Sequence, residues 1–223
     1  YDAGVKCIAD IIYMDCYDAG MTTKYGITKT IAKKLSKDLV ETYNTICSGP
    51  VSIKNYLQAL VKHRVSVQNE DTVCWMSPSG FPCVSEKWIM NKKKIELPFT
   101  SGRIQVVVHE QTTRPAMHEM ISGISPNYVH SMDAAHMSLV IVELEKAGIL
   151  SFGAIHDSFS VHAERVDELL DITKETFINI YDKNIFKDMR NEIISNDPLF
   201  VESEPTKGKL DLLELMKSDY FFC

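Results

Sequence analysis

The chain has 223 residues, of which 45% are hydrophobic and 24% charged, with ten glycines and eight prolines. This is the composition of an ordinary globular protein, and it excludes a collagen-like, low-complexity or wholly disordered chain. No segment approaches the ~18 uninterrupted apolar residues of a membrane-spanning helix, so no membrane partner is expected. No charged-then-apolar leader follows Tyr1, so either a signal peptide is absent or the start of the chain is missing. Taken alone, the formal net charge of -6 argues against a free-standing nucleic-acid-binding protein.

This net charge hides an uneven distribution along the chain. Residues 21–64 carry eight basic and two acidic side chains, whereas residues 164–223 carry eight basic and fourteen acidic ones. Within the basic segment, Lys29, Lys33 and Lys37 recur every four residues and therefore share one helix face. That face is either simply solvated, the commoner outcome, or it lies along a phosphate backbone. A second face of the same helix is apolar: Leu35, Leu39, Val40 and Tyr43.

The six cysteines show neither C-x2-C spacing nor a suitably spaced histidine pair, so no zinc site is expected. Scattered single cysteines fit a reducing compartment better than a disulfide scaffold. We therefore expect each of them to be a small buried apolar side chain. They are Cys7, Cys16, Cys47, Cys74, Cys83 and Cys223.

The middle of the chain predicts one helix and several strands. The helix is expected near Val51–His63, with a stripe of apolar residues on one side. Two β-type runs between residues 71 and 84 flank Pro78-Ser79-Gly80, which is typical of a hairpin turn. Residues 104–108 are expected to form another strand, downstream of the basic run 92–94.

Two further helices are expected in the second half of the chain. Ser125 and Pro126 are typical of an N-cap and a first helical position, so a helix is predicted from there to Gly148. Another is predicted over residues 165–181. Its expected buried side chains are Val166, Leu169, Leu170, Ile172, Thr173, Phe177 and Ile180.

Between these helices, residues 149–161 predict a strand, a tight turn at His156-Asp157 and a second strand. A carboxylate held rigidly at a hairpin tip is suited to bind a divalent cation, because such ions prefer hard oxygen ligands. From the dipeptide alone, however, an ordinary aspartate turn is the commoner structure.

Two other groups could bind a ligand. His130, Asp133 and His136 are spaced three residues apart on a predicted helix. They could ligate a metal, but hydrogen-bonding groups at the edge of the core are favoured because no Cys or Glu completes the set. Tyr25, followed by Gly26, could stack on a nucleotide or donate its hydroxyl to a sugar, or could be a half-buried core tyrosine.

Five stretches, in this order, resemble the phage-type single-subunit DNA-dependent RNA polymerases, the family that includes the mitochondrial enzymes. They are Met21–Gly26, Trp75–Pro82, Ser122–His136, Phe152–Phe159 and Asp211–Cys223. The resemblance implies an α+β right-hand polymerase fold with a small antiparallel sheet and flanking helices. It further implies a fingers-like helical segment at 1–70 and a palm at 71–223 that contains the catalytic hairpin and the C-terminal tail.

The same resemblance implies roles for single residues. Asp157 is similar to the family's aspartate that binds both catalytic Mg2+ ions, and His156 to the histidine beside the RNA 3′ end. Tyr25 is similar to the tyrosine that selects ribose over deoxyribose, with Gly26 following it as in the family. His130 is similar to a histidine near the minor groove of the primer-template duplex. The lysine face of Lys29, Lys33 and Lys37 is then expected to contact nucleic acid.

The implied activity is template-dependent transfer of a nucleotide from an NTP to the RNA 3′-hydroxyl, with a DNA template. Tyr25, and Ser158 after Asp157, favour ribonucleotide synthesis over a family-A DNA polymerase fragment, which remains an alternative. The family needs a second catalytic aspartate, and residues 1–20 do not supply its motif. Tyr13 and Tyr17 also stand where an Arg and a Lys are expected.

We therefore expect a second polypeptide or an upstream region to supply the other aspartate and the N-terminal part of the enzyme, as in a heterodimeric split polymerase. The other alternative is a degenerate, non-catalytic module that serves assembly or nucleic-acid binding. The expected location is intracellular, in a phage-infected host cytoplasm or in a mitochondrion.

Overall fold

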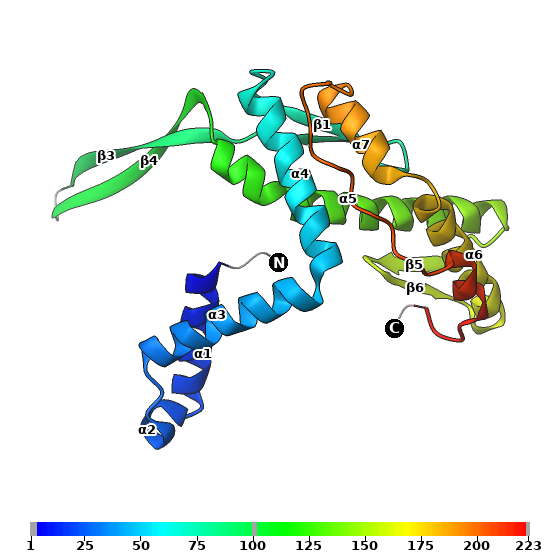
Figure 1. Cartoon of the computed structure of the whole chain (residues 1–223), viewed down its shortest axis with the longest axis horizontal. Coiled ribbons are helices and arrows are strands. Elements are labelled where there is room, and N and C mark those ends of the chain that lie inside the picture. Colours follow the sequence, from blue (N-terminus) through cyan, green and yellow to red (C-terminus); the bar gives the residue numbers. More distant parts are fainter. Residues whose placement is uncertain (1–3, 100–101, 222–223) are drawn as a thin grey trace. The chain divides into compact units, whose positions relative to one another are not determined.

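The computed structural model describes residues 4–99 and 102–221, and it shows a chain of mixed helices and small antiparallel sheets (Figure 1). The chain divides into two compact units, Tyr1–Asn55 and Tyr56–Cys223. No helix within the described ranges is both long enough and apolar enough to cross a membrane. The boundary expected at residue 70, between a fingers-like segment and a palm, is defined by function rather than by compactness. It stays a prediction.

The first unit is helical. It contains α1 (Val5–Asp18), α2 (Met21–Tyr25) and α3 (Lys29–Ile46), and α4 (Ser48–Ser66) begins in it. Helix α1 packs against both α2 and α3. Thr28 caps α3, because its hydroxyl oxygen accepts a hydrogen bond from the Ile31 N–H at 3.3 Å.

The apolar face expected on α3 is present but is largely exposed in this unit. Leu35, Leu39 and Tyr43 are 46%, 48% and 54% exposed. The buried positions of α3 are instead Ala32 and Ser36, one helical turn apart. Small side chains at these positions allow a neighbouring helix to approach closely, since the distance between helix axes depends on the side chains at the contact.

Within the described residues, the second unit holds all the strands, as three separate two-stranded antiparallel hairpins. In chain order, after α4, its elements are β1 (Val73–Met76), β2 (Pro82–Ser85), β3 (Trp88–Phe99), β4 (Gly102–Pro115), α5 (Met117–Lys146), β5 (Phe152–Ile155), β6 (Ser158–Val161), η1 (Ala163–Arg165), α6 (Val166–Tyr181), α7 (Ile185–Ile194) and η2 (Leu212–Lys217). The hairpin predicted around Pro78-Ser79-Gly80 is confirmed as β1–β2.

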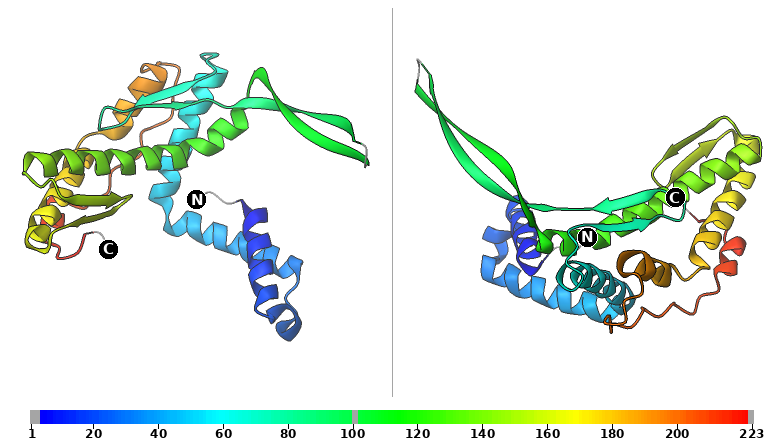
Figure 2. Two further views of the ribbon diagram at one scale, coloured as in Figure 1. Left: turned by 180° about the vertical axis from the view of Figure 1, so that it is seen from behind. Right: turned by 90° about the horizontal axis from the view of Figure 1, so that it is seen from above.

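The strand predicted at 104–108 is part of the longer strand β4, which pairs with β3. The basic run 92–94 lies in β3 itself, opposite 107–109. Both views in Figure 2 show the β3–β4 hairpin extending away from the other elements of the second unit.

The long helix α5 begins earlier than predicted. It starts at Met117, so Pro126 lies inside the helix and Ser125 is not its cap. Met120, Ile124 and Tyr128 are buried and lie four residues apart, so one buried stripe runs along the helix on both sides of the proline. Burial of this stripe therefore stabilises the helix even though Pro126 has no N–H to donate. Tertiary packing here outweighs the low helix propensity of proline.

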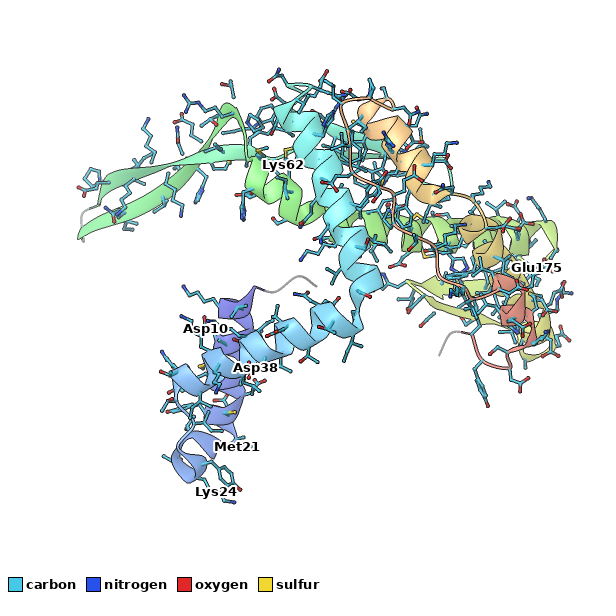
Figure 3. The ribbon with its side chains drawn as sticks, viewed as in Figure 1. Asp10, Met21, Lys24, Asp38, Lys62 and Glu175 are labelled. Atoms are coloured by element: carbon cyan, nitrogen blue, oxygen red, sulfur yellow. The ribbon has the colours of Figure 1, made fainter. Side chains whose placement is uncertain are left out.

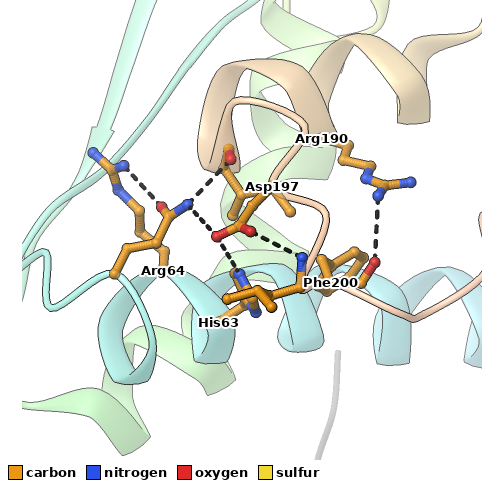
Figure 4. Close-up of polar contacts among 8 residues, drawn as sticks. His63, Arg64, Arg190, Asp197 and Phe200 are labelled. Carbon is orange, nitrogen blue, oxygen red and sulfur yellow. Dashed lines mark hydrogen bonds and ion pairs between the residues drawn. The ribbon is translucent and has the colours of Figure 1, made fainter.

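A polar cluster joins the end of α4 to the segment after α7 (Figure 4). His63 Nε2 lies 3.0 Å from the Asp197 carboxylate, which also accepts hydrogen bonds from the Leu199 N–H and the Gln68 amide. These hydrogen bonds lower the pKa of Asp197 to about 2, and the bond with His63 makes the largest contribution. Nearby, Arg190 donates a hydrogen bond to the Phe200 carbonyl at 3.3 Å.

Two expectations about buried side chains were wrong. None of the five described cysteines is buried, and Cys223 lies outside the described residues. Cys74 shows the reason, since it alternates with buried Val73 and Trp75 along β1 and therefore faces the opposite side of the hairpin. Val166, the first residue of α6, is 48% exposed, whereas Leu169 one turn later is buried.

Candidate active site

The second unit presents His156 and Asp157 at the tip of the β5–β6 hairpin. The strands pair in antiparallel register from Phe152–Val161 to Ile155–Ser158, which leaves these two residues as the turn. His156 has a φ of 55°, a positive value of the kind that tight two-residue hairpin turns require. The predicted strand, turn and strand are confirmed, and both turn side chains are exposed.

A compact core holds this hairpin in place. Phe159 and Val161 of β6 pack against a buried cluster that includes Val140 and Leu144 of α5 and Leu169 of α6. Each fully buried side chain of this size contributes about 1.5–3 kcal/mol relative to exposure. The turn is therefore attached to two long helices through its second strand.

His136 strengthens the same attachment. It is buried on α5, and its Nε2 lies 3.0 Å from the Thr173 carbonyl of α6, to which it can donate a hydrogen bond. Its ring meets Phe159 and Phe177 edge to face, with centroids 6.1 and 5.7 Å away. Burial lowers the pKa of His136, so the neutral imidazole is favoured. Of the three side chains predicted to form hydrogen bonds at the edge of the core, His136 makes such a bond and is buried, whereas Asp133 is exposed.

The donor chemistry of the hairpin tip suits a hard divalent cation, because Asp157 offers carboxylate oxygens in an exposed position. Across the described residues, however, no group of three or more His, Cys, Asp or Glu side chains is placed to hold a metal ion. Asp157 can therefore be one ligand of a metal site, and the remaining protein ligands would have to come from elsewhere.

In the first unit, Tyr25 is the last residue of α2 and is 63% exposed. The Lys24 ammonium, labelled in Figure 3, lies 5.1 Å from the centroid of the Tyr25 ring, within the range of a cation–π contact. Gly26 ends the helix with φ 64°, a left-handed conformation that glycine adopts without steric cost. The tyrosine is thus a surface residue rather than a half-buried core residue.

The three lysines expected to contact nucleic acid lie on α3, and all are exposed. The ammonium of Lys29, at the start of the helix, lies 5.4 Å from the centroid of the Tyr13 ring on α1. Lys33 and Lys37 follow at one-turn intervals, as the spacing predicted.

His130 lies at an exposed position of α5 in the second unit. The next residue, Ser131, accepts a hydrogen bond from the Trp75 indole at 3.0 Å and donates one to the Tyr128 carbonyl at 2.7 Å. These bonds tie β1 to α5, so two of the five sequence stretches that carry the resemblance meet in space.

The structure thus brings His156 and Asp157 together and places His130 in the same unit, whereas Tyr25, Gly26 and the lysine face belong to the other unit.

Sequence reasoning missed Lys174, a buried lysine of α6 whose ammonium donates to the Ser218 carbonyl at 2.5 Å. Phe221 also meets Phe177 edge to face at 5.1 Å. Together they hold the C-terminal stretch against α6. The signal in the sequence was a lysine with Leu170, Phe177 and Ile178 at one-turn spacing from it.

Comparison with known proteins matches the profile of the DNA-dependent RNA polymerase family to residues 21–198. DNA-directed RNA polymerase 1A of Nicotiana tabacum is 31% identical over 151 residues, which are 67% of this chain and 94% of that protein. The mitochondrial DNA-directed RNA polymerase 1 of Arabidopsis thaliana is 29% identical over 160 residues, which are 71% of this chain and 16% of that protein.

DNA-directed RNA polymerase 2 of Arabidopsis thaliana, named as chloroplastic and mitochondrial, is 31% identical over 160 residues, again 71% of this chain but 15% of that protein. The chain thus spans about a sixth of the length of these long relatives. The family profile covers both the hairpin with His156-Asp157 and the α2–α3 segment with Tyr25. This chain therefore belongs to the DNA-dependent RNA polymerase family.

Proposed function

We propose that this chain supplies the palm, with part of the fingers, of a right-hand DNA-directed RNA polymerase. In this proposal residues 71–223 are the palm and residues 1–70 a fingers-like segment. The observation that carries the proposal is the family match over residues 21–198, which contain the His156-Asp157 turn. This turn is exposed, and its hairpin packs on a buried core. The substrates are NTPs and the 3′ end of an RNA paired with a DNA template.

The proposed reaction is attack of the RNA 3′-oxygen on the α-phosphorus of the NTP. A new phosphodiester bond forms, and the bond to the leaving pyrophosphate breaks. Asp157 would hold Mg2+, and bound Mg2+ would lower the pKa of the attacking hydroxyl and neutralise charge on the pyrophosphate. The hairpin fixes the position of that carboxylate, while His156 would lie beside the RNA 3′ end.

The first unit would bind the nucleotide and nucleic acid. The exposed hydroxyl of Tyr25 can contact the sugar of the incoming nucleotide, and Gly26 gives the chain its turn at that point. Lys33 and Lys37, with Lys29, present positive charge that suits a phosphate backbone. His130 in the second unit would contact the minor groove of the duplex.

A second catalytic carboxylate is part of the proposal, because two-metal phosphoryl transfer needs more than one protein ligand. We assign it to another polypeptide or to an upstream region of a longer chain. The long relatives support this, since this chain matches about a sixth of their length. Their names place them in mitochondria and chloroplasts, and we propose a mitochondrion or a phage-infected cytoplasm as the location for this chain.

Primer extension tests the proposal. The chain is assayed with a DNA template, an RNA primer, NTPs and Mg2+, first alone and then with a candidate upstream polypeptide. We expect synthesis only in the second case, and Asp157→Ala should reduce it at least about 1000-fold by removing a metal ligand. Asp171→Ala, at an exposed carboxylate of α6, is the matched control and should leave synthesis unchanged.

A non-catalytic module is the second candidate, and α1 gives the observation that favours it. This helix carries Tyr13 and Tyr17 where the family has the Arg and Lys of the nucleotide site. Full synthesis by the assembled Asp157→Ala variant would support this candidate. Synthesis with dNTPs in preference to NTPs would instead indicate a DNA polymerase fragment.

A further inference from the structure

A cavity of about 470 Å3 lies in the second unit. It is lined by β1 with its following turn and by helices α5, α6 and α7, which are labelled in Figure 1. Its volume falls in the range of sites that hold small organic ligands or a protein side chain. His130, His156 and Asp157 do not line it.

The floor of the cavity is mainly apolar. It is formed by side chains that are buried in the core of the unit, which include two aromatic rings: Trp75, Tyr128, Met132, Ile180 and Met189. The Trp75 indole is fixed by its hydrogen bond to Ser131. Aromatic faces of this kind attract cations as well as apolar groups.

The rim is acidic. Glu143, Asp188 and Glu192 line the cavity together with a single lysine, Lys183. Glu143 pairs with Lys146 at 2.7 Å, and Glu192 accepts a hydrogen bond from the Met76 N–H at 2.6 Å. The Asp188 carboxylate has no hydrogen-bond or ion-pair partner among residues 4–99 and 102–221.

Tyr128 gives a second, independent indication of a ligand. The residue is 6% exposed and lines the cavity, yet its hydroxyl makes no hydrogen bond to the described part of the chain. Burial, followed by the negative charge of neighbouring groups that include Glu192 and Asp188, raises the pKa of Tyr128. The Tyr128 oxygen can therefore accept a hydrogen bond from a ligand in the cavity that carries a donor.

We propose that this cavity binds a cationic group on an apolar body: an amidinium, a guanidinium or a primary ammonium. The apolar body would lie against Trp75 and Tyr128, and the cation would pair with Asp188 and Glu192 at the rim. The Tyr128 oxygen would accept a hydrogen bond from an N–H group of the cation. The same chemistry can come from a small organic cation or from an arginine or lysine side chain of a polypeptide.

Fluorescence titration with benzamidine tests this proposal without nucleotides or nucleic acid, so its outcome is separate from that of the polymerase assay. The chain has two tryptophans, and Trp88→Phe leaves Trp75 as the reporter inside the cavity. We expect a saturable change in Trp75 emission. Benzamide, which is similar in shape but neutral, should bind at least tenfold more weakly.

Matched variants locate the site. Asp188→Asn with Glu192→Gln should weaken benzamidine binding at least tenfold, because both rim charges are removed. Asp171→Asn with Glu175→Gln removes two exposed charges of α6 that do not line the cavity, and binding should stay within twofold (Glu175 is labelled in Figure 3). Asn179→Phe narrows the rim at an exposed position and should abolish binding without disturbing the core.

The proposal is overturned if the emission change does not saturate, if benzamide binds as well as benzamidine, or if both double variants weaken binding equally. A normal benzamidine affinity in Asn179→Phe would likewise place binding elsewhere. A parallel titration with acetyl-arginine amide and an arginine-containing peptide identifies the source. Tighter binding of the peptide indicates a polypeptide partner, and tighter binding of benzamidine indicates a small cation.

Discussion

The β5–β6 hairpin and the α2–α3 segment both carry residues expected to act in polymerisation, but they are supported differently. The hairpin packs through Phe159 and Val161 on a fully buried cluster of α5 and α6. In α1, α2 and α3, the buried side chains are small: Ala9, Ala32 and Ser36. The large apolar side chains of these three helices, such as Leu35, Leu39 and Tyr43, remain about half exposed.

The two parts therefore differ in what holds their expected functional residues in position. The carboxylate that we propose to hold an ion needs a fixed position, and the second unit can provide it with its own core. The first unit buries little apolar surface, so its helices gain little stability from within the unit. The first unit should therefore be the part that responds more to binding of nucleotide, nucleic acid or another polypeptide.

The largest expected effect on stability compares one leucine from each part. Leu144→Ala leaves a cavity beneath the hairpin, because Leu144 is fully buried, and should destabilise the chain by about 2–5 kcal/mol. Leu39→Ala, at a half-exposed position, should change stability by no more than about 0.5 kcal/mol. Urea unfolding followed by circular dichroism measures both, and equal losses would contradict the comparison.

A smaller effect is expected for the turn that follows Tyr25. Gly26→Ala forces a Cβ atom into a left-handed conformation and should cost about 1–2 kcal/mol, although there is open space around it. Gly49→Ala is the matched control, because Gly49 lies in helix α4, also with open space, and should be neutral or stabilising. Thermal melting monitored at the helix band compares the two variants. A loss of the same size in both would show that backbone conformation at Gly26 is not the cause.

The exposed Tyr25 hydroxyl offers a still smaller, functional effect. Tyr25→Phe removes one hydrogen-bond donor and should raise the ratio of dNTP to NTP incorporation by the assembled polymerase up to about tenfold. Competition between NTPs and dNTPs in primer extension measures this ratio. Tyr43→Phe, at another exposed tyrosine of the same unit, should leave it unchanged.

The last prediction concerns pH and tests the attachment of the hairpin. His136 has its pKa lowered from 6.5 by burial, against the opposing effects of its bond to Thr173 and the charge of Asp133. Its neutral form therefore contributes stability that is present above pH 6.5 and is lost as the pH falls toward the folded-state pKa. His136→Asn should flatten this part of the stability profile, as measured by urea unfolding between pH 7.5 and 5. An unchanged slope would assign the titration to another group.

Local patterns in the sequence predicted two of the three hairpins, whereas for β3–β4 they predicted only part of one strand. The turn at Pro78-Ser79-Gly80 and the turn at His156-Asp157 both lie where alternating apolar runs are interrupted by turn-forming residues. The boundaries of α6 were also close to the prediction, because its apolar positions follow a helical period. The start of α5 could not be predicted locally, since Pro126 is a typical first helical residue and only burial of Met120 and Ile124 extends the helix before it.

The family and the expected roles of Asp157, His156 and Tyr25 could be inferred without a structure, because they depend on residue identity and order. Tertiary structure decided which side chains are buried, for example Lys174 and His136 rather than the cysteines. It also decided that β1, α5, α6 and α7 enclose an acidic-rimmed cavity from residues far apart in the chain. The physical reason is that burial and cavity shape depend on contacts between distant segments, which local periodicity does not encode.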